Sequence, residues 1–150
     1  MSVETKTAER VVISASPEET FALGAELGRA MKGGEIVLMT GGLGAGKTLM
    51  TKGILHALGL ETDEVTSPSF ALVNLYQAKF PVYHIDLWRI GDAADAAAEV
   101  GLDEIFEDES AVVIIEWAEK LKRLEHPVKA IRISIEGDGD ESRKIEIREM

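Results

Sequence analysis

The chain has 150 residues, of which 45% are hydrophobic and 29% charged, and its formal net charge is −11. This composition predicts one globular domain over 1–150, and without a run of about 18 apolar residues we expect no transmembrane helix. The lack of cysteine excludes disulfides, thiolate catalysis and Cys-type zinc sites, and the acidic charge argues against unaided binding to nucleic acid.

The N-terminal residues 1–10 are polar and contain no apolar segment of the kind found in secretory signals. We therefore expect a cytoplasmic protein with a flexible tail over 1–7. We expect the chain to bind neither a membrane nor DNA.

The first half of the chain alternates apolar strands with amphipathic helices. Ser16, Pro17 and Glu19 have the order typical of a helix start, with an N-cap, a proline at the first helical position and an acid at the third. The elements expected here are a strand over 9–14, a helix from Pro17 to Gly33-Gly34, a strand over 35–40, a helix over 48–58 and a loop over 61–69.

The second half predicts two hairpins that flank a further apolar strand. Apolar strands alternating with helices imply a parallel sheet covered on both sides, and hairpins add antiparallel strands. The expected elements are a hairpin of 71–76 and 81–87, helical pieces in 92–106 broken by Gly101, a strand over 111–115, a short helix over 117–124 and a terminal hairpin of 129–136 and 143–149.

The strongest motif is GGLGAGKT, 41–48, which matches the phosphate-binding pattern G-x-x-x-x-G-K-[ST] between a buried strand and a helix. Glycines let backbone N–H groups wrap a phosphate, and the helix N-terminus adds partial positive charge. Lys47 would reach the β- and γ-phosphates of ATP, and the Thr48 hydroxyl would bind Mg²⁺. The fold class predicted is a three-layer α/β/α P-loop NTPase with a mixed, mainly parallel sheet. The candidate nucleotide-binding residues of this segment are Gly42, Leu43, Gly44, Ala45, Gly46, Lys47, Thr48 and Leu49.

Two carboxylates follow apolar strands. Glu116 ends VVII at the position where P-loop proteins more often carry aspartate, and it could hold Mg²⁺ or orient the attacking water. Asp86 ends a strand in HIDLWR, where a His-x-Asp pair is more often structural, but a second carboxylate would help to support Mg²⁺ and polarise water. We consider Lys47, Asp86 and Glu116 as catalytic candidates and Thr48, Glu116 and Asp86 as metal ligands, while Arg89 could pair with an acid or touch the γ-phosphate.

The loop TSPSF, 66–70, carries hydroxyls in the first long loop after the P-loop helix. In many P-loop hydrolases that loop senses the γ-phosphate, whereas composition alone would favour a solvated turn. No Asn-Lys-x-Asp motif follows the strand that ends at Glu116, which disfavours a Ras-type GTPase.

The runs GGLGAGKT, VTSPSFALVNLY, YHIDLWRI and VVIIEWAEK occur in an order and spacing that closely resembles the TsaE family, small bacterial ATPases of tRNA threonylcarbamoyladenosine biosynthesis. The resemblance implies a P-loop fold and a complex with TsaD and TsaB, which modify adenosine 37 of tRNA. It further implies that the chain contacts tRNA only indirectly, through that complex. It also implies phosphate and Mg²⁺ contacts by Lys47 and Thr48.

The same resemblance implies a switch-like loop that contains Thr66, two important carboxylates at Asp86 and Glu116, and a cofactor-side aromatic at Trp117. Three positions depart from the family's usual residues without removing the motif. They are Leu49, Ser69 and Trp88.

Two other functions compete with the ATPase subunit. A small-molecule P-loop kinase would need an acceptor pocket and usually a basic lid, and no arginine-rich insertion is present. A nucleotide-gated interaction module would differ only in whether turnover is required.

Overall fold

The computed structural model describes residues 8–42, 44–61, 72–91, 95–121, 130–137 and 141–149. The expected tail over 1–7 lies outside the described residues. Every helix within the described ranges is too short or too polar to cross a lipid bilayer.

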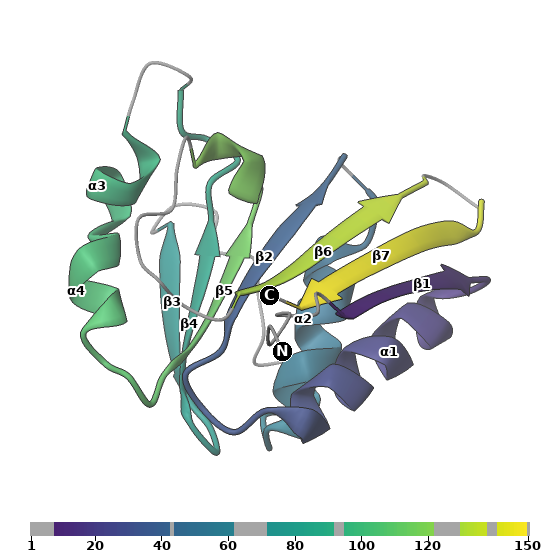
Figure 1. The fold of residues 1–150 in the computed structure, drawn as a ribbon, viewed down its shortest axis with the longest axis horizontal. Coiled ribbons are helices and arrows are strands. Elements are labelled where there is room, and N and C mark those ends of the chain that lie inside the picture. Colours follow the sequence, from purple (N-terminus) through teal and green to yellow (C-terminus); the bar gives the residue numbers. More distant parts are fainter. Residues whose placement is uncertain are drawn as a thin grey trace, which may run out of the picture.

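A seven-stranded sheet with the order β1-β7-β6-β2-β5-β4-β3 runs through the molecule (Figure 1). The central strands β6, β2, β5 and β4 are parallel neighbours, and antiparallel pairs of strands extend the sheet on both sides. The mixed sheet predicted from the sequence is therefore confirmed. The strands are β1 (Ala8–Ser14), β2 (Ile36–Gly41), β3 (Val73–Gln77), β4 (Pro81–Asp86), β5 (Val112–Glu116), β6 (Ala130–Glu136) and β7 (Arg143–Glu149).

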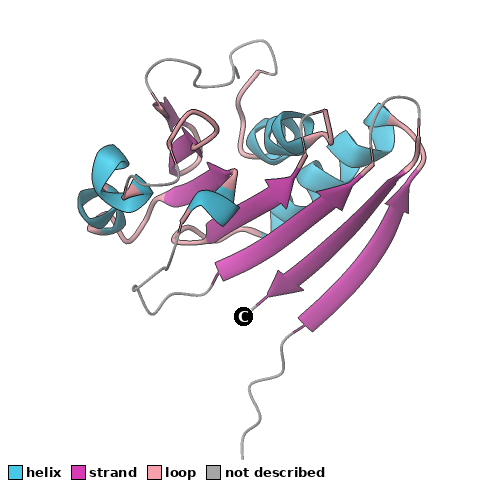
Figure 2. Cartoon of the chain, turned by 90° about the horizontal axis from the view of Figure 1, so that it is seen from above, coloured by secondary structure: helices cyan, strands magenta, loops and turns pink. Residues whose placement is uncertain are grey.

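Apolar clusters cover both faces of the central sheet, because successive side chains of a strand point to opposite faces. In β2, Val37 and Met39 belong to a core shared with the two long helices, whereas Ile36 and Leu38 belong to a second core shared with the two short ones. The helices are α1 (Pro17–Ala30), α2 (Lys47–Ala57), α3 (Ala96–Val100) and α4 (Leu102–Phe106). Helices on both sides of the sheet give the three layers that the sequence predicted (Figures 1 and 2).

Helix α1 starts as its sequence predicts. The Ser16 side chain accepts a hydrogen bond from the Glu19 N–H at 3.2 Å, and the Glu19 carboxylate accepts one from the Ala15 N–H. The bond to Ser16 satisfies an N–H group that an α-helix leaves unpaired at its start, and the bond from Ala15 holds the backbone just before the N-cap. The two bonds fix the connection from β1 into α1, which passes next to the P-loop.

Helices α1 and α2 pack backbone against backbone. A Cβ atom added to Gly24 would lie 2.3 Å from the Met50 carbonyl oxygen, and one added to Gly53 would lie 2.2 Å from the Phe21 carbonyl oxygen. Only glycine allows this approach. The contact fixes α2, and with it the P-loop that α2 follows.

One predicted element is wrong. The helix expected over 117–124 is a single 3-10 turn, Ala118–Lys120, with Leu121 already extended. Trp117 has a left-handed backbone with φ of +59°, which interrupts the helical pattern at its first residue. Residues 122–124 lie outside the described part.

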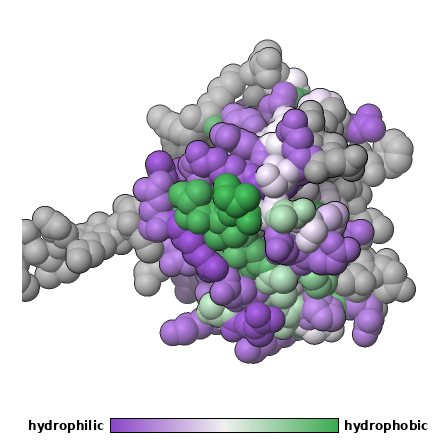
Figure 3. All heavy atoms as spheres, turned by 90° about the vertical axis from the view of Figure 1, so that its right-hand side faces the viewer, coloured by the Kyte–Doolittle hydropathy of each residue, from purple (hydrophilic) through white to green (hydrophobic). Residues whose placement is uncertain are grey.

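No helix of the described residues covers one face of the strands β6, β7 and β1 (Figures 1 and 2). Val11 and Ile13 of the edge strand β1 are more than half exposed there. Figure 3, viewed from the right-hand side of Figure 1, shows an apolar patch surrounded by polar surface.

Candidate functional site

The site lies where the parallel strands β2, β5 and β4 end at the same edge of the sheet. In register, Met39 of β2 lies beside Glu116 of β5, and Glu116 lies beside Asp86 of β4. The carboxyl ends of adjacent parallel strands therefore bring the P-loop and both predicted carboxylates together. This is the edge at which open α/β sheets bind ligands.

A cavity of about 300 Å³ opens at this edge. Most of the predicted site residues line it, together with Trp88, which the sequence analysis did not assign to the site. The lining residues are Gly44, Ala45, Gly46, Lys47, Thr48, Leu49, Asp86, Trp88, Glu116 and Trp117. Gly42 borders a neighbouring depression instead, and Leu43 and Thr66 lie outside the described residues. Ser67 and Ser69 of the predicted switch loop also lie outside them.

Lys47 is 5% exposed and is held by the loop that precedes it. Its Nζ donates hydrogen bonds to the carbonyl oxygens of Gly41 and Gly42 at 2.7 and 2.8 Å. It also lies 4.1 Å from the centroid of the Trp117 ring, within range of a cation–π interaction. Burial lowers the pKa of Lys47, an effect that the carboxylate of Glu116 opposes.

Trp117 owes its position to the left-handed backbone at the end of β5. Such a conformation costs a non-glycine residue about 1–3 kcal/mol, so the surrounding contacts must hold it. The Trp88 ring packs on it with centroids 4.5 Å apart and a tilt of 40°. Together the two indoles form an aromatic wall beside Lys47.

Glu116 is 2% exposed and binds the start of α2. The Thr48 hydroxyl donates hydrogen bonds to Oε1 and Oε2 of Glu116 at 3.0 and 3.3 Å. His84 Nε2 contacts Oε2 of the same carboxylate, and His84 is fully buried. Its Nδ1 has no hydrogen-bond partner within the described part of the chain.

The sequence pattern gave no sign of the His84 contact. His84 and Glu116 lie on neighbouring strands, and only the pairing of β4 with β5 brings them together. The His84 ring fixes one oxygen of Glu116 from below while Thr48 binds from the side of the P-loop.

Asp86 is partly exposed in the cavity. Burial raises the pKa of its carboxyl, the backbone N–H of Trp88 lowers it, and nearby Glu116 raises it again, with a net upward shift. The Trp88 N–H donates to Asp86 Oδ1 at 2.9 Å. Arg89 is exposed in the turn that follows and is not among the cavity-lining residues.

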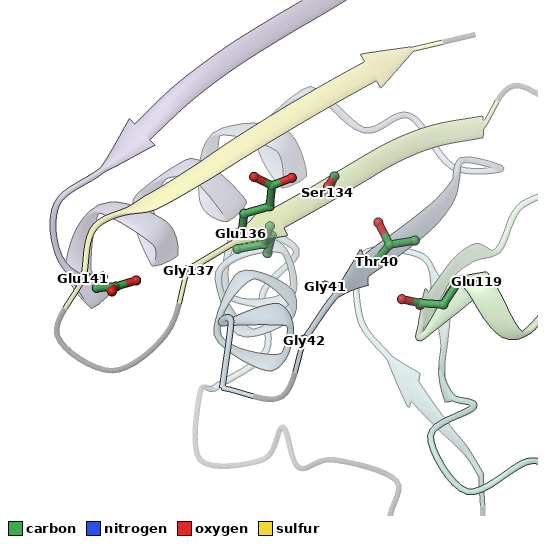
Figure 4. Close-up of a pocket in the computed structure, with 9 residues that line it drawn as sticks. Thr40, Gly41, Gly42, Glu119, Ser134, Glu136, Gly137 and Glu141 are labelled. Carbon is green, nitrogen blue, oxygen red and sulfur yellow. The ribbon is translucent and has the colours of Figure 1, made fainter.

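An acidic depression of about 520 Å³ lies next to the start of the P-loop (Figure 4). Glu119, Glu136 and Glu141 border it next to Gly41 and Gly42. Three carboxylates would repel a polyphosphate, so phosphate groups fit the side that contains Lys47. The cavity at the strand ends holds the cation Lys47 together with the carboxylates of Asp86 and Glu116, whereas no lysine or arginine of the described residues lines the acidic depression.

The carboxylates and hydroxyl of the site are hard oxygen donors of the kind that Mg²⁺ prefers. In the described residues no group of three or more His, Cys, Asp or Glu side chains could hold a metal ion alone. Thr48, Glu116 and Asp86 therefore fit an ion that takes its remaining ligands from phosphate oxygens and water, as Mg²⁺ commonly does with nucleotides.

The match to known proteins covers nearly the whole chain. Residues 14–145 match the family model described as "Threonylcarbamoyl adenosine biosynthesis protein TsaE". The tRNA threonylcarbamoyladenosine biosynthesis protein TsaE of Bacillus subtilis is 36% identical over 87% of this chain and 79% of its own length, and that of Treponema pallidum is 33% identical over 90% and 97%.

A solved structure gives the same picture of the fold. The crystal structure of Bacillus subtilis YdiB superposes with a TM-score of 0.71 at 30% identity, covering 97% of this chain and 88% of that one. The P-loop fold predicted from the sequence is thereby confirmed. With its family model matched over residues 14–145 and its relatives aligned over most of their length, this chain belongs to the TsaE family.

Proposed function

We propose that this chain binds ATP and Mg²⁺ at the P-loop, hydrolyses the ATP, and serves the threonylcarbamoyladenosine modification of tRNA together with TsaD and TsaB proteins. The observation that carries the proposal is the meeting of Lys47, Thr48 and Glu116 in one cavity. Residues with these three chemistries are what a Mg-nucleotide site needs. The tRNA role rests on the family match and on the relatives in Bacillus subtilis and Treponema pallidum, both of which are named tRNA threonylcarbamoyladenosine biosynthesis proteins.

Binding of the triphosphate begins with the loop and Lys47. An ammonium group has three N–H donors, and the carbonyls of Gly41 and Gly42 use two of them. Within the described part of the chain, one donor and the positive charge remain for a phosphate oxygen. The N-terminus of α2 adds its partial positive charge at the same point.

Mg²⁺ would be held by Thr48, with Glu116 and Asp86 as the supporting carboxylates. When bound, the ion neutralises charge on the phosphates and supplies electrophilic stabilisation. Thr48 and Glu116 are already in contact, so the ligand set needs little rearrangement. His84 keeps Glu116 oriented from beneath.

Hydrolysis requires that a water be oriented and lose a proton. Asp86 suits this role because its carboxylate is partly exposed in the cavity, where it can accept a hydrogen bond from a water. Its position next to Glu116 on the neighbouring strand keeps it within the cavity. In this scheme Glu116 and Asp86 both support the metal, and Asp86 also orients the water.

The site is short of positive charge for phosphoryl transfer. Of the described residues that line the cavity, Lys47 alone is cationic. Transition-state charge in such reactions is stabilised by preorganised positive groups, and an arginine supplied by a partner can raise rates about 10³–10⁵-fold in GTPases. We therefore expect slow turnover by the chain alone and faster turnover when partners dock.

The experiment is steady-state phosphate release at saturating ATP and Mg²⁺, for the chain alone and with purified TsaD and TsaB. Lys47→Ala with the same partners is the control for ATPase activity that comes from the partners themselves. We expect low release alone, an increase with partners, and no increase with Lys47→Ala. Equal rates with and without partners would contradict activation, and undetectable Lys47-dependent release in both would contradict hydrolysis.

A further inference from the structure

The guanidinium of Arg143, at the start of β7, binds the back of the P-loop. Its Nε donates to the Ala45 carbonyl oxygen at 3.0 Å, and its Nη2 donates to the Gly44 carbonyl oxygen at 3.2 Å. These partners lie 98 and 99 positions away along the chain. The same guanidinium donates through Nη1 to the carbonyl oxygen of Glu141.

We infer that Arg143 is a positioning residue that sets the orientation of the phosphate-binding peptides. This inference rests on the proposed binding of a nucleotide at the P-loop. The geometry follows from the planar trans peptide, in which the C=O and the next N–H point in opposite directions. When Arg143 holds the carbonyls of Gly44 and Ala45 outward, it turns the N–H groups of Ala45 and Gly46 to the other side.

The Ala45 N–H supports this orientation. It donates to the Gly42 carbonyl oxygen at 3.2 Å, across the inside of the loop. Inward-pointing N–H groups are the feature with which a P-loop binds phosphate. Gly44 and Gly46 have φ values of +75° and +110°, so neither restricts the peptide planes as other residues would. Because the loop glycines do not fix these peptide planes, a side chain from outside the loop, Arg143, can determine their orientation.

The hairpin of β6 and β7 is shaped to let Arg143 reach the loop. Gly137, after β6, has a φ of +127°, and a Cβ atom there would lie 2.9 Å from Cδ of Arg143. Gly41 also lies close to β6, since a Cβ atom added to Gly41 would lie 2.6 Å from the Ile135 carbonyl oxygen. The end of the β6–β7 hairpin therefore contacts the P-loop at two places, through Ile135 at Gly41 and through Arg143 at Gly44 and Ala45.

Two cations now share the loop carbonyls. Lys47 holds those of Gly41 and Gly42, and Arg143 holds those of Gly44 and Ala45. Lys47 does so from the phosphate side, whereas Arg143 lines a separate cavity of about 360 Å³ that also borders Ser14 and Thr20. Because Arg143 faces this second cavity, direct contact with a ligand there is the competing explanation that a test must separate.

The test compares Arg143→Gln with Arg148→Gln, the same substitution on the same strand at an exposed residue that pairs with Glu9. Binding of ATP and of inorganic tripolyphosphate, which has no base or ribose, is measured by calorimetry with Mg²⁺. We expect Arg143→Gln to weaken both ligands by the same factor, about tenfold to a hundredfold, because two charge-assisted hydrogen bonds are lost. Arg148→Gln should leave both unchanged.

Arg143→Lys provides a second variant, since it keeps the charge but cannot present a planar fork to two carbonyls. We expect it to weaken tripolyphosphate binding as well. In the protein without ligand, the amide resonances of Ala45 and Gly46 should shift in Arg143→Gln and not in Arg148→Gln, at unchanged thermal unfolding midpoints.

Wild-type affinity for both ligands in Arg143→Gln, or unmoved Ala45 and Gly46 resonances, would overturn the inference. A loss confined to ATP would also overturn it, because Arg143 would then touch the base or ribose. If the wild-type chain bound neither ligand, the proposed function itself would fail, and the amide resonances would still decide whether Arg143 orients the loop.

Discussion

The hydroxyl of Thr48 donates a hydrogen bond to Oε1 of Glu116 at 3.0 Å, across 68 positions of the sequence. Thr48 is the last residue of the P-loop motif and the second residue of α2, and Glu116 ends strand β5. The contact joins the phosphate-binding motif to Glu116, the carboxylate that the sequence analysis proposed as a metal ligand because it ends an apolar strand. It also defines where a divalent ion would share ligands with a nucleotide.

Removal of either carboxylate should separate binding from turnover. Glu116→Gln and Asp86→Asn keep the size of the side chain but lose the charge that serves metal and water. We expect ATP binding to remain while hydrolysis falls by about 10²–10⁴-fold, the usual contribution of a positioned acid–base group. Single-turnover phosphate release and calorimetry together measure the two effects.

Glu119→Gln is the matched control, because Glu119 is exposed and borders the acidic depression outside the cavity. It should hydrolyse ATP at the wild-type rate. Wild-type turnover in Asp86→Asn or Glu116→Gln would remove that residue from the catalytic scheme.

The raised pKa of Asp86 predicts a cost in stability. The folded chain binds this proton more tightly than the unfolded chain, so the associated stability is present at low pH and is lost as the pH rises through the raised pKa. At neutral pH without Mg²⁺, Asp86→Asn should therefore be more stable than wild type, and the difference should shrink on acidification. Urea unfolding at several pH values measures this, and an Asp86→Asn protein less stable than wild type at neutral pH would refute the assignment.

The contact between α1 and α2 predicts a strong effect at Gly53. A methyl group there would overlap the Phe21 carbonyl oxygen, and the strain outweighs the gain in helix propensity of about 1 kcal/mol. We expect Gly53→Ala to lower the free energy of unfolding by about 1–3 kcal/mol, as over-packing usually does. Gly91→Ala is the control, because a Cβ atom at Gly91 would meet nothing within 4 Å. Equal stability of the two variants would mean that the helices separate without cost.

Isolated tRNA should bind poorly to the isolated chain. With a net charge of −11, the chain as a whole repels the phosphates of tRNA, which weakens the non-specific binding that counterion release drives. Titration of labelled tRNA at physiological salt should show no tight complex unless TsaD and TsaB are added. Submicromolar binding by the chain alone would show that a local basic surface outweighs the overall charge.

The sequence predicted the features that depend on local residues. The P-loop pattern, the capped start of α1 and the two hairpins need only neighbouring positions, and each is present. The charge and apolar pattern of β5 also identified Glu116 as the end of a buried strand. These elements together were enough for the fold class.

The features that depend on strand order could not be predicted. Arg143 reaches the P-loop only because β7 pairs with β6 next to β2, and His84 reaches Glu116 only because β4 pairs with β5. The left-handed backbone of Trp117 has no signal in its own sequence, since the following residues favour a helix. From the sequence, Arg89 is an arginine that could pair with an acid or touch the γ-phosphate, which stays a prediction, whereas the sequence does not single out Arg143, which binds the P-loop.

The central claim, that the P-loop is a nucleotide site, is tested most directly by calorimetric titration of ATP with Mg²⁺ into wild type and Lys47→Ala. Lys47 is the cation that lines the described cavity, and its removal leaves the phosphate charge uncompensated. Lys52→Ala, in the same helix, controls for the loss of a positive charge. The account predicts binding by wild type and Lys52→Ala and a severe loss in Lys47→Ala with its fold intact; equal ATP affinity in all three would contradict it.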